Sequence, residues 1–106
     1  MRDYRNFDDV QKDALSDPSE ALAYLDLAIE EYGDDGDKEA FLLALRRVAD
    51  AQGGLGQLAE ESGVNRQHLY DALSAKGNPR LDTLTRVLRG MGYRLRIDRI
   101  HSSPTH

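Results

Sequence analysis

The sequence predicts an all-α domain of five or six helices, with a helix-turn-helix at about residues 56–76 and one β-strand near the C-terminus. Apolar residues recur at helical spacing through most of the chain. Glycines and Asp-Pro or Asn-Pro steps mark the ends of the predicted helices, and only one short segment alternates apolar with polar residues. A chain of 106 residues is long enough for one domain with its own core. We place that domain at residues 1–100 and a disordered tail at residues 101–106.

Two helices are expected before residue 34. Residues 1–16 favour a short amphipathic helix, because apolar residues follow helical spacing at Phe7, Val10, Ala14 and Leu15. Asp17-Pro18-Ser19-Glu20 is typical of a helix start, with an Asp cap and a proline in the first turn. An apolar stripe then follows at Leu22, Leu25, Ile29 and Tyr32, and Gly33 is expected to end the helix.

The acidic link at residues 34–37 does not fit a calcium loop. If Gly36 were the loop's glycine, the terminal bidentate Glu would fall on Leu42. We expect a solvated turn whose Asp37 caps a helix over about residues 38–52. That helix would bury Phe41, Leu42, Leu45, Val48 and Ala49, and it would end at Gly53-Gly54.

Residues 53–56 are expected to form a flexible link. They lack the GK[ST] ending of a P-loop and follow a helix rather than a strand. Residues 57–73 then predict two short helices joined at Gly63, where a tight turn needs φ > 0. The inward side chains of the second helix are predicted to be Val64, Leu69, Ala72 and Leu73.

The polar residues of the second helix suit a DNA major groove, where Arg reads guanine and Gln reads adenine. We expect Asn65 to cap this helix and Asn78 and Arg80, in the loop after it, to clamp phosphates. The predicted DNA-binding residues are Asn65, Arg66, Gln67, His68, Tyr70, Asn78 and Arg80. Tyr70 fits equally well as a core aromatic beside Leu69. A helix-glycine-helix corner is also common in α-domains that bind no DNA.

Gly77-Asn78-Pro79 is expected to break the chain before a last helix at residues 81–91, closed by Gly92. Its predicted inward side chains are Leu81, Leu84, Val87, Leu88 and Met91. Residues 93–98 alternate and predict a strand that lacks a partner within the chain. We therefore expect antiparallel pairing with a second subunit in a homodimer, through Tyr93, Leu95 and Ile97.

Charge is divided unequally along the chain. Residues 1–65 carry 6 Lys/Arg and 16 Asp/Glu, a net charge of -10, whereas residues 66–106 carry 8 and 3, a net charge of +5. The basic part begins at the second motif helix, as DNA binding requires. A salt-bridged interface between the two halves is the alternative.

Several function classes are excluded or disfavoured. The chain has no cysteine, so no disulfide, thiolate nucleophile or Cys-ligated zinc is available, and we expect no metal or cofactor. No run approaches the roughly 18 apolar residues of a membrane span, and the N-terminus lacks a signal peptide's apolar core, so a cytoplasmic location is expected. His68 and Asp71 share a helix face, but spacing ties no nucleophile to them, so we expect no enzyme.

A run of short motifs resembles the addiction-module antidote proteins of the HigA type over about residues 7–98. The most specific block is Leu69-Tyr70-Asp71-Ala72-Leu73-Ser74-Ala75-Lys76-Gly77-Asn78-Pro79. The resemblance implies a phage-repressor-like helical domain, binding to the operon's own promoter, and neutralisation of a toxin of the RelE-like class that cleaves messenger RNA.

Two positions depart from that family's pattern. Gly56 stands where a Ser or Thr often caps the first motif helix, and Asp71 stands where a basic residue is usual. Phosphates repel a carboxylate that faces DNA. Such a carboxylate is favourable only where it accepts a hydrogen bond from the amino group of a cytosine. We expect an antitoxin that is also a DNA-binding transcriptional repressor. The alternative is a protein-interaction module that binds its partner through the acidic N-terminal half and does not contact DNA, and RNA binding ranks third.

Overall fold

The computed structural model describes residues 12–100, and within them every regular element is a helix. A helical turn at residues 12–15 precedes α2 (Pro18–Asp35), α3 (Lys38–Ala51), α4 (Gly54–Ser62), α5 (Arg66–Ala72) and α6 (Leu81–Gly90). The all-α prediction is confirmed for this part of the chain. Phe7 and Val10 of the predicted first helix and the predicted tail at 101–106 lie outside the described residues.

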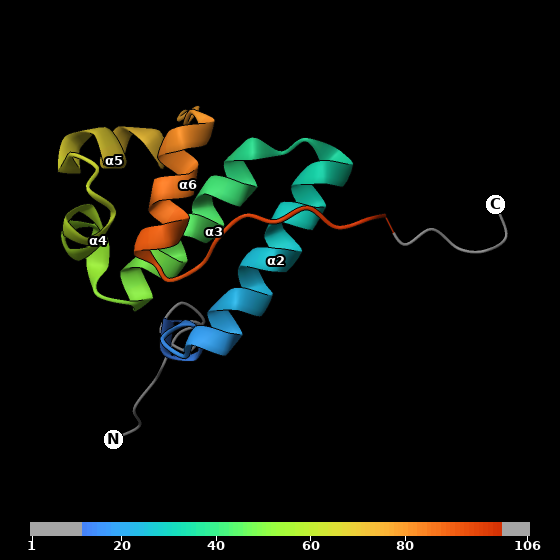
Figure 1. Ribbon diagram of the computed structural model, residues 1–106, viewed down its shortest axis with the longest axis horizontal. Coiled ribbons are helices and arrows are strands. Elements are labelled where there is room, and N and C mark those ends of the chain that lie inside the picture. Colours follow the sequence, from blue (N-terminus) through green and yellow to red (C-terminus); the bar gives the residue numbers. More distant parts are fainter. Residues whose placement is uncertain (1–11, 101–106) are drawn as a thin grey trace, which may run out of the picture.

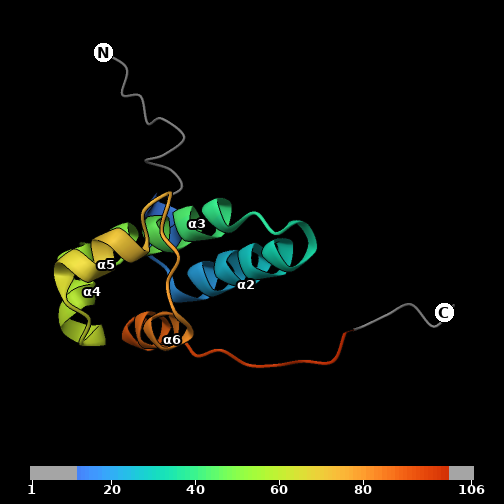
Figure 2. The ribbon, with the colours of Figure 1, turned by 90° about the horizontal axis from the view of Figure 1, so that it is seen from above.

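Helices α2 and α3 form an antiparallel pair along one side of the molecule (Figures 1 and 2). Asp17 caps α2 as predicted, since its carboxylate accepts from the backbone N–H of Ser19 at 2.9 Å. The predicted end at Gly33 is wrong. The helix continues to Asp35, because the left-handed residue that closes it is Gly36, at φ 70°.

Helix α3 forms the centre of the core, with Leu42, Leu45 and Val48 almost completely buried. Asp37 caps it as predicted, accepting from the N–H of Ala40 at 3.1 Å. On α2 the predicted apolar stripe is only partly buried. Leu22 remains 52% exposed and Tyr32 39% exposed, so this side of α2 is not fully covered.

The predicted flexible link at residues 53–56 is wrong, because α4 already begins at Gly54. Gly53 precedes it at φ 120°, and a Cβ there would lie 2.3 Å from Oε1 of Gln57, whose side chain folds back over the helix start. Gly56 therefore lies inside α4 and does not cap it.

Helices α4 and α5 meet at a short turn that begins with Gly63, at φ 75° as predicted. Leu69 and Leu73 are completely buried, and the guanidinium of Arg46 on α3 donates to the Leu73 carbonyl. The loop after α5 folds back against the end of that helix, since a Cβ on Gly77 would lie 2.1 Å from the carbonyl oxygen of Ala72.

Helix α6 packs against α4, where a Cβ on Gly90 would lie 2.9 Å from Cβ of Ser62. The prediction that Leu81 points inward is wrong. Leu81 is 70% exposed, because it is the first residue of α6 and precedes the part of the helix that faces the core. Val87 and Leu88 are buried as predicted.

The predicted strand at residues 93–98 is also wrong. After Tyr93, residues 94–100 have no regular structure and run outward on the α2 side of the molecule (Figures 1 and 2). A strand needs a neighbour to satisfy its backbone groups, and no second strand exists among residues 12–100.

Candidate nucleic-acid interface

The outward face of α5 presents the polar residues that the sequence predicted. Arg66, Gln67 and His68 are exposed, whereas Leu69 and Ala72 are buried and hold the helix on the core. The helix is short, with seven residues, so its position depends on this packing and on its cap.

Asn65 caps α5, which confirms its predicted structural role. Its side-chain oxygen accepts from the backbone N–H of Gln67 at 2.9 Å and of His68 at 3.1 Å. Two of the helix's four unpaired N–H groups are thereby satisfied. The same amide has little capacity left to accept from a base, so Asn65 mainly sets the direction of α5.

A shallow groove between the start of α5 and the start of α6 brings three predicted residues together, namely Asn65, His68 and Arg80. Arg80 is the residue immediately before α6, and Arg86 on α6 also lines the groove. Arg86 was missing from the predicted site, although its place in a basic C-terminal half was a signal. One carboxylate, that of Asp82, lies on the same groove.

Tyr70 lies on the other side of α5 from this groove. It is 56% exposed, so the core-aromatic alternative is wrong. It lines a separate hollow with residues of α3 and α4, namely Arg46, Arg47, Asp50 and Leu55. Asn78 is exposed in the loop before α6 but lines neither hollow.

Asp71 lies on the exposed face of α5, one turn after Gln67. Its Oδ1 accepts from Nε2 of Gln67 at 3.2 Å. The unusual carboxylate of this helix is therefore not directed into the core but is presented beside the Gln67 amide.

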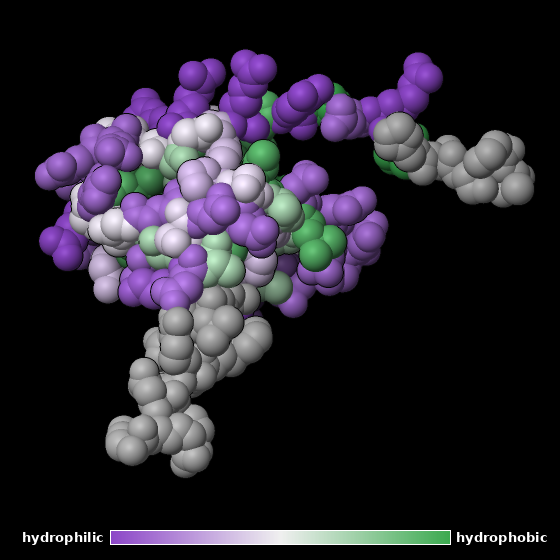
Figure 3. Space-filling model, turned by 90° about the horizontal axis from the view of Figure 1, so that it is seen from below, coloured by the Kyte–Doolittle hydropathy of each residue, from purple (hydrophilic) through white to green (hydrophobic). Residues whose placement is uncertain are grey.

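A second surface lies between α2 and the C-terminal segment. An apolar groove of about 220 Å³ opens there, and Figure 3 shows apolar surface in the hollow beside the outstretched segment. Leu22, Ile29 and Leu95 line it. Of the three residues predicted for the dimer, Tyr93 and Leu95 line this groove, whereas Ile97 is 97% exposed and is not part of its lining.

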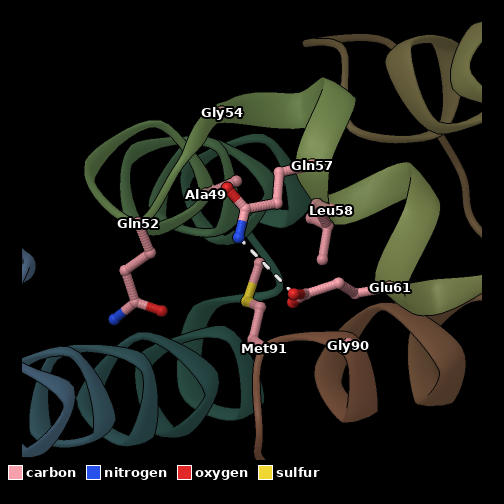
Figure 4. Close-up of a pocket in the computed structure, with 8 residues that line it drawn as sticks. All are labelled: Ala49, Gln52, Gly54, Gln57, Leu58, Glu61, Gly90 and Met91. Carbon is pink, nitrogen blue, oxygen red and sulfur yellow. Dashed lines mark hydrogen bonds between the residues drawn. The ribbon is translucent and has the colours of Figure 1, made fainter.

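A smaller crevice among the ends of α3, α4 and α6 holds the side chains of Gln52, Gln57 and Met91 (Figure 4). Gln57 Nε2 donates to Glu61 Oε2 at 3.4 Å, and Gln52 Nε2 donates to the Leu15 carbonyl at 3.2 Å. The first contact lies within α4 and the second joins the end of α3 to the helical turn at residues 12–15, and we assign the crevice no function.

Within residues 12–100 no cluster of three or more His, Asp or Glu side chains is arranged to hold a metal ion. No helix in the same range is long and apolar enough to cross a membrane.

Comparison with known proteins gives a family. The family model described as "Probable addiction module antidote protein" matches residues 3–99. The chain belongs to this family. An antidote counteracts a toxin, so membership implies a toxin partner for this antidote protein.

An uncharacterized protein of Haemophilus influenzae is 30% identical over 83 residues, which cover 78% of this chain and 80% of that protein. No solved structure matches the chain.

Proposed function

We propose that this antidote is the antitoxin of a type II toxin–antitoxin module of the HigA type. In this proposal it represses its own operon in the cytoplasm through sequence-specific DNA binding and acts as a protein that binds rather than catalyses. Helix α5 enters the major groove. The observation that carries the DNA-binding proposal is the capped, exposed start of α5 beside two arginines, Arg80 and Arg86.

The chemistry of the residues divides the work between them. Arg66 and Gln67 are exposed at the start of α5, where a recognition helix contacts base edges. Arg80 and Arg86 line the groove next to α5, where they suit phosphates that pass along the major-groove edge.

Gel-shift titration on the promoter of its own operon tests this division. Arg66→Ala is expected to lose about 1 to 3 kcal/mol of specific binding if Arg66 reads a base. Arg80→Ala is expected to weaken all sequences alike and to reduce the salt slope by about one unit. Lys38→Ala is the control, because Lys38 begins α3 at the opposite end of the molecule (Figure 1). Unchanged binding by both arginine variants would refute the placement of the DNA face.

The same titration separates this proposal from the protein-interaction alternative. Two carboxylates, Asp71 and Asp82, lie on or beside the proposed DNA face, and they are the observation that favours a module without DNA binding. Such a module would show only weak binding that does not distinguish the promoter from a scrambled duplex.

For the toxin, we propose a RelE-like messenger-RNA-cleaving protein that meets the acidic side of α2. A toxin that works on ribosomal RNA must expose positive charge, so opposite fields would speed the encounter. The carboxylates of α2 and its turn are exposed at Asp26, Glu30, Glu31, Asp34, Asp35 and Asp37. Asp35 and Asp37 also accept backbone hydrogen bonds at the turn, so Glu30 and Glu31 are the better pair to change.

Stopped-flow association with the cognate toxin tests the acidic contact. The double variant Glu30→Gln/Glu31→Gln is expected to associate more slowly at low salt, with the difference shrinking as salt rises. The matched control is Glu60→Gln/Glu61→Gln on α4, which removes the same charge elsewhere. Equal rates for the two double variants would assign no specific role to α2.

We also propose that the antidote acts as a homodimer in which a second copy covers the groove between α2 and the C-terminal segment. Ile97 and Ile100 are almost fully exposed and Leu22 is 52% exposed, so apolar side chains of the segment and of α2 are open to a second copy. The segment carries both signs of charge, with Arg96 and Asp98 3.7 Å apart. A two-fold contact needs such a self-complementary patch.

Light scattering tests the dimer with the variant Leu95→Asp/Ile97→Asp. The variant is expected to be a monomer. A dimer contacts two half-sites of an operator at once, whereas a monomer contacts only one, so the affinity for the promoter should fall steeply. For the light scattering the control is Leu81→Asp, which places one aspartate at another exposed leucine, outside the C-terminal segment. A double variant that stays dimeric would place the interface elsewhere.

A further inference from the structure

We propose that Asp71 is a specificity-determining residue of α5 that selects a cytosine in the operator. The inference rests on the DNA-binding function proposed above, and it names the base that the recognition helix requires. It starts from the position of the Asp71 carboxylate on the outward face of α5 and from its hydrogen bond with Gln67.

The Asp71 carboxylate has no role in holding the fold. The residue is exposed, and within residues 12–100 its carboxylate makes no ion pair and accepts only from Gln67 Nε2, at 3.2 Å. The bonds that Ser74 donates go to the backbone carbonyl of Asp71 and not to its side chain. A carboxylate that serves neither the core nor a cap remains available to a ligand.

On DNA this carboxylate can accept only from a base. Phosphates repel it, and guanine and thymine present acceptors in the major groove, at N7 and O6 or at O4. The donors are the amino groups of cytosine and adenine. Adenine places its N7 acceptor next to that amino group, so the second carboxylate oxygen would face the N7 lone pair, which repels it. Cytosine has no such acceptor, and it is the base that an aspartate favours.

Gln67 makes the selection sharper, because its bond to Asp71 fixes the orientation of both groups. One N–H of the Gln67 amide is used by Asp71, which leaves the other N–H and Oε1 of this exposed side chain available to a base. The pair therefore presents Asp71 as an acceptor alone and Gln67 as a donor and acceptor. Two neighbouring base positions are read together, with cytosine opposite Asp71.

In vitro selection from a randomised duplex pool tests the inference with the full chain. The natural protein is expected to enrich a site with one cytosine position that Asp71→Asn no longer selects. Asparagine has almost the same shape, but it donates as well as accepts and can pair with adenine N6 and N7. The variant is thus expected to move that position from cytosine toward adenine while the other positions stay the same. On matched duplexes the natural protein should prefer cytosine about tenfold, and the variant should not.

Asp34→Asn is the matched control, because Asp34 is exposed near the end of α2, away from α5, and should leave the selected site unchanged. The same enriched site for the natural protein and for Asp71→Asn would overturn the role of Asp71 while leaving DNA binding intact. A natural protein that enriches no sequence would instead overturn the proposed DNA binding, and the inference with it.

Discussion

The hydroxyl of Tyr93 donates to the carbonyl oxygen of Pro18 at 2.8 Å and so joins residues 75 positions apart. Pro18 is the first residue of α2, and Tyr93 follows α6, where its own N–H donates to the Leu88 carbonyl at 2.8 Å. This contact fixes the point at which the C-terminal segment leaves the helical body. The groove beside α2 therefore depends on it.

Tyr93→Phe is expected to lower the free energy of unfolding by about 0.5 to 1.5 kcal/mol, because the Pro18 carbonyl loses a donor. Urea denaturation measures the change. Tyr70→Phe is the control, since the Tyr70 side chain is 56% exposed and no hydrogen bond of its hydroxyl to the described residues is found. Equal stability of the two variants would mean that the Tyr93 contact contributes nothing.

Gly77→Ala is expected to destabilise the protein by about 1 to 3 kcal/mol, because the new Cβ would lie 2.1 Å from the Ala72 carbonyl oxygen and the loop must shift. Thermal unfolding measures it. Gly33→Ala is the comparison variant and should have the opposite effect, because nothing lies within 4 Å of its new Cβ and the position is inside α2. It should stabilise by roughly 0.5 to 1 kcal/mol through helix propensity. Loss of stability in both would contradict the description of the two sites.

Asn65→Ala should cost about 1 kcal/mol, because the N–H groups of Gln67 and His68 lose their acceptor. Asn65→Asp keeps an acceptor and adds a negative charge at the helix start, which favours the fold but repels phosphates. The Asn65→Asp variant should therefore keep the free energy of unfolding of the natural protein but bind the promoter with lower affinity. Retained affinity in this variant would show that Asn65 lies away from the DNA.

Asp17 should make stability depend on pH in the acid range. Hydrogen bonds from the backbone and hydroxyl of Ser19 lower the pKa of the Asp17 carboxyl in the folded protein, against a small opposing effect of burial. A lowered folded pKa means that the contribution is present above the ordinary aspartate pKa and is lost as the pH falls through the folded value. The stability difference between the natural protein and Asp17→Asn should therefore shrink on acidification.

Carboxyl NMR titration checks the cause of this shift. The Asp17 midpoint should lie below the ordinary aspartate value and should move back toward it in Ser19→Ala, which removes the hydroxyl donor but keeps the backbone donor. A midpoint at the ordinary value in the natural protein would remove the basis for the pH effect.

Much of the helical framework was predictable because its causes are local. The caps at Asp17, Asp37 and Asn65 act on backbone groups two or three residues away. Gly63 adopts the left-handed φ of the turn without strain, because glycine has no Cβ. The buried residues of α3 follow from helical spacing alone. The exposed start of α5, and with it most of the candidate site, was therefore visible in the sequence.

The sequence by itself thus determined which segments are helical, where three of them are capped, and which side of α5 faces solvent, since each depends on neighbours within about one turn. Only the tertiary structure decided that residues 94–100 form no strand with any other part of residues 12–100, and that Tyr70 lies outside the core. It also placed Arg86 beside His68. These outcomes depend on packing between elements distant along the chain, which spacing and composition do not specify.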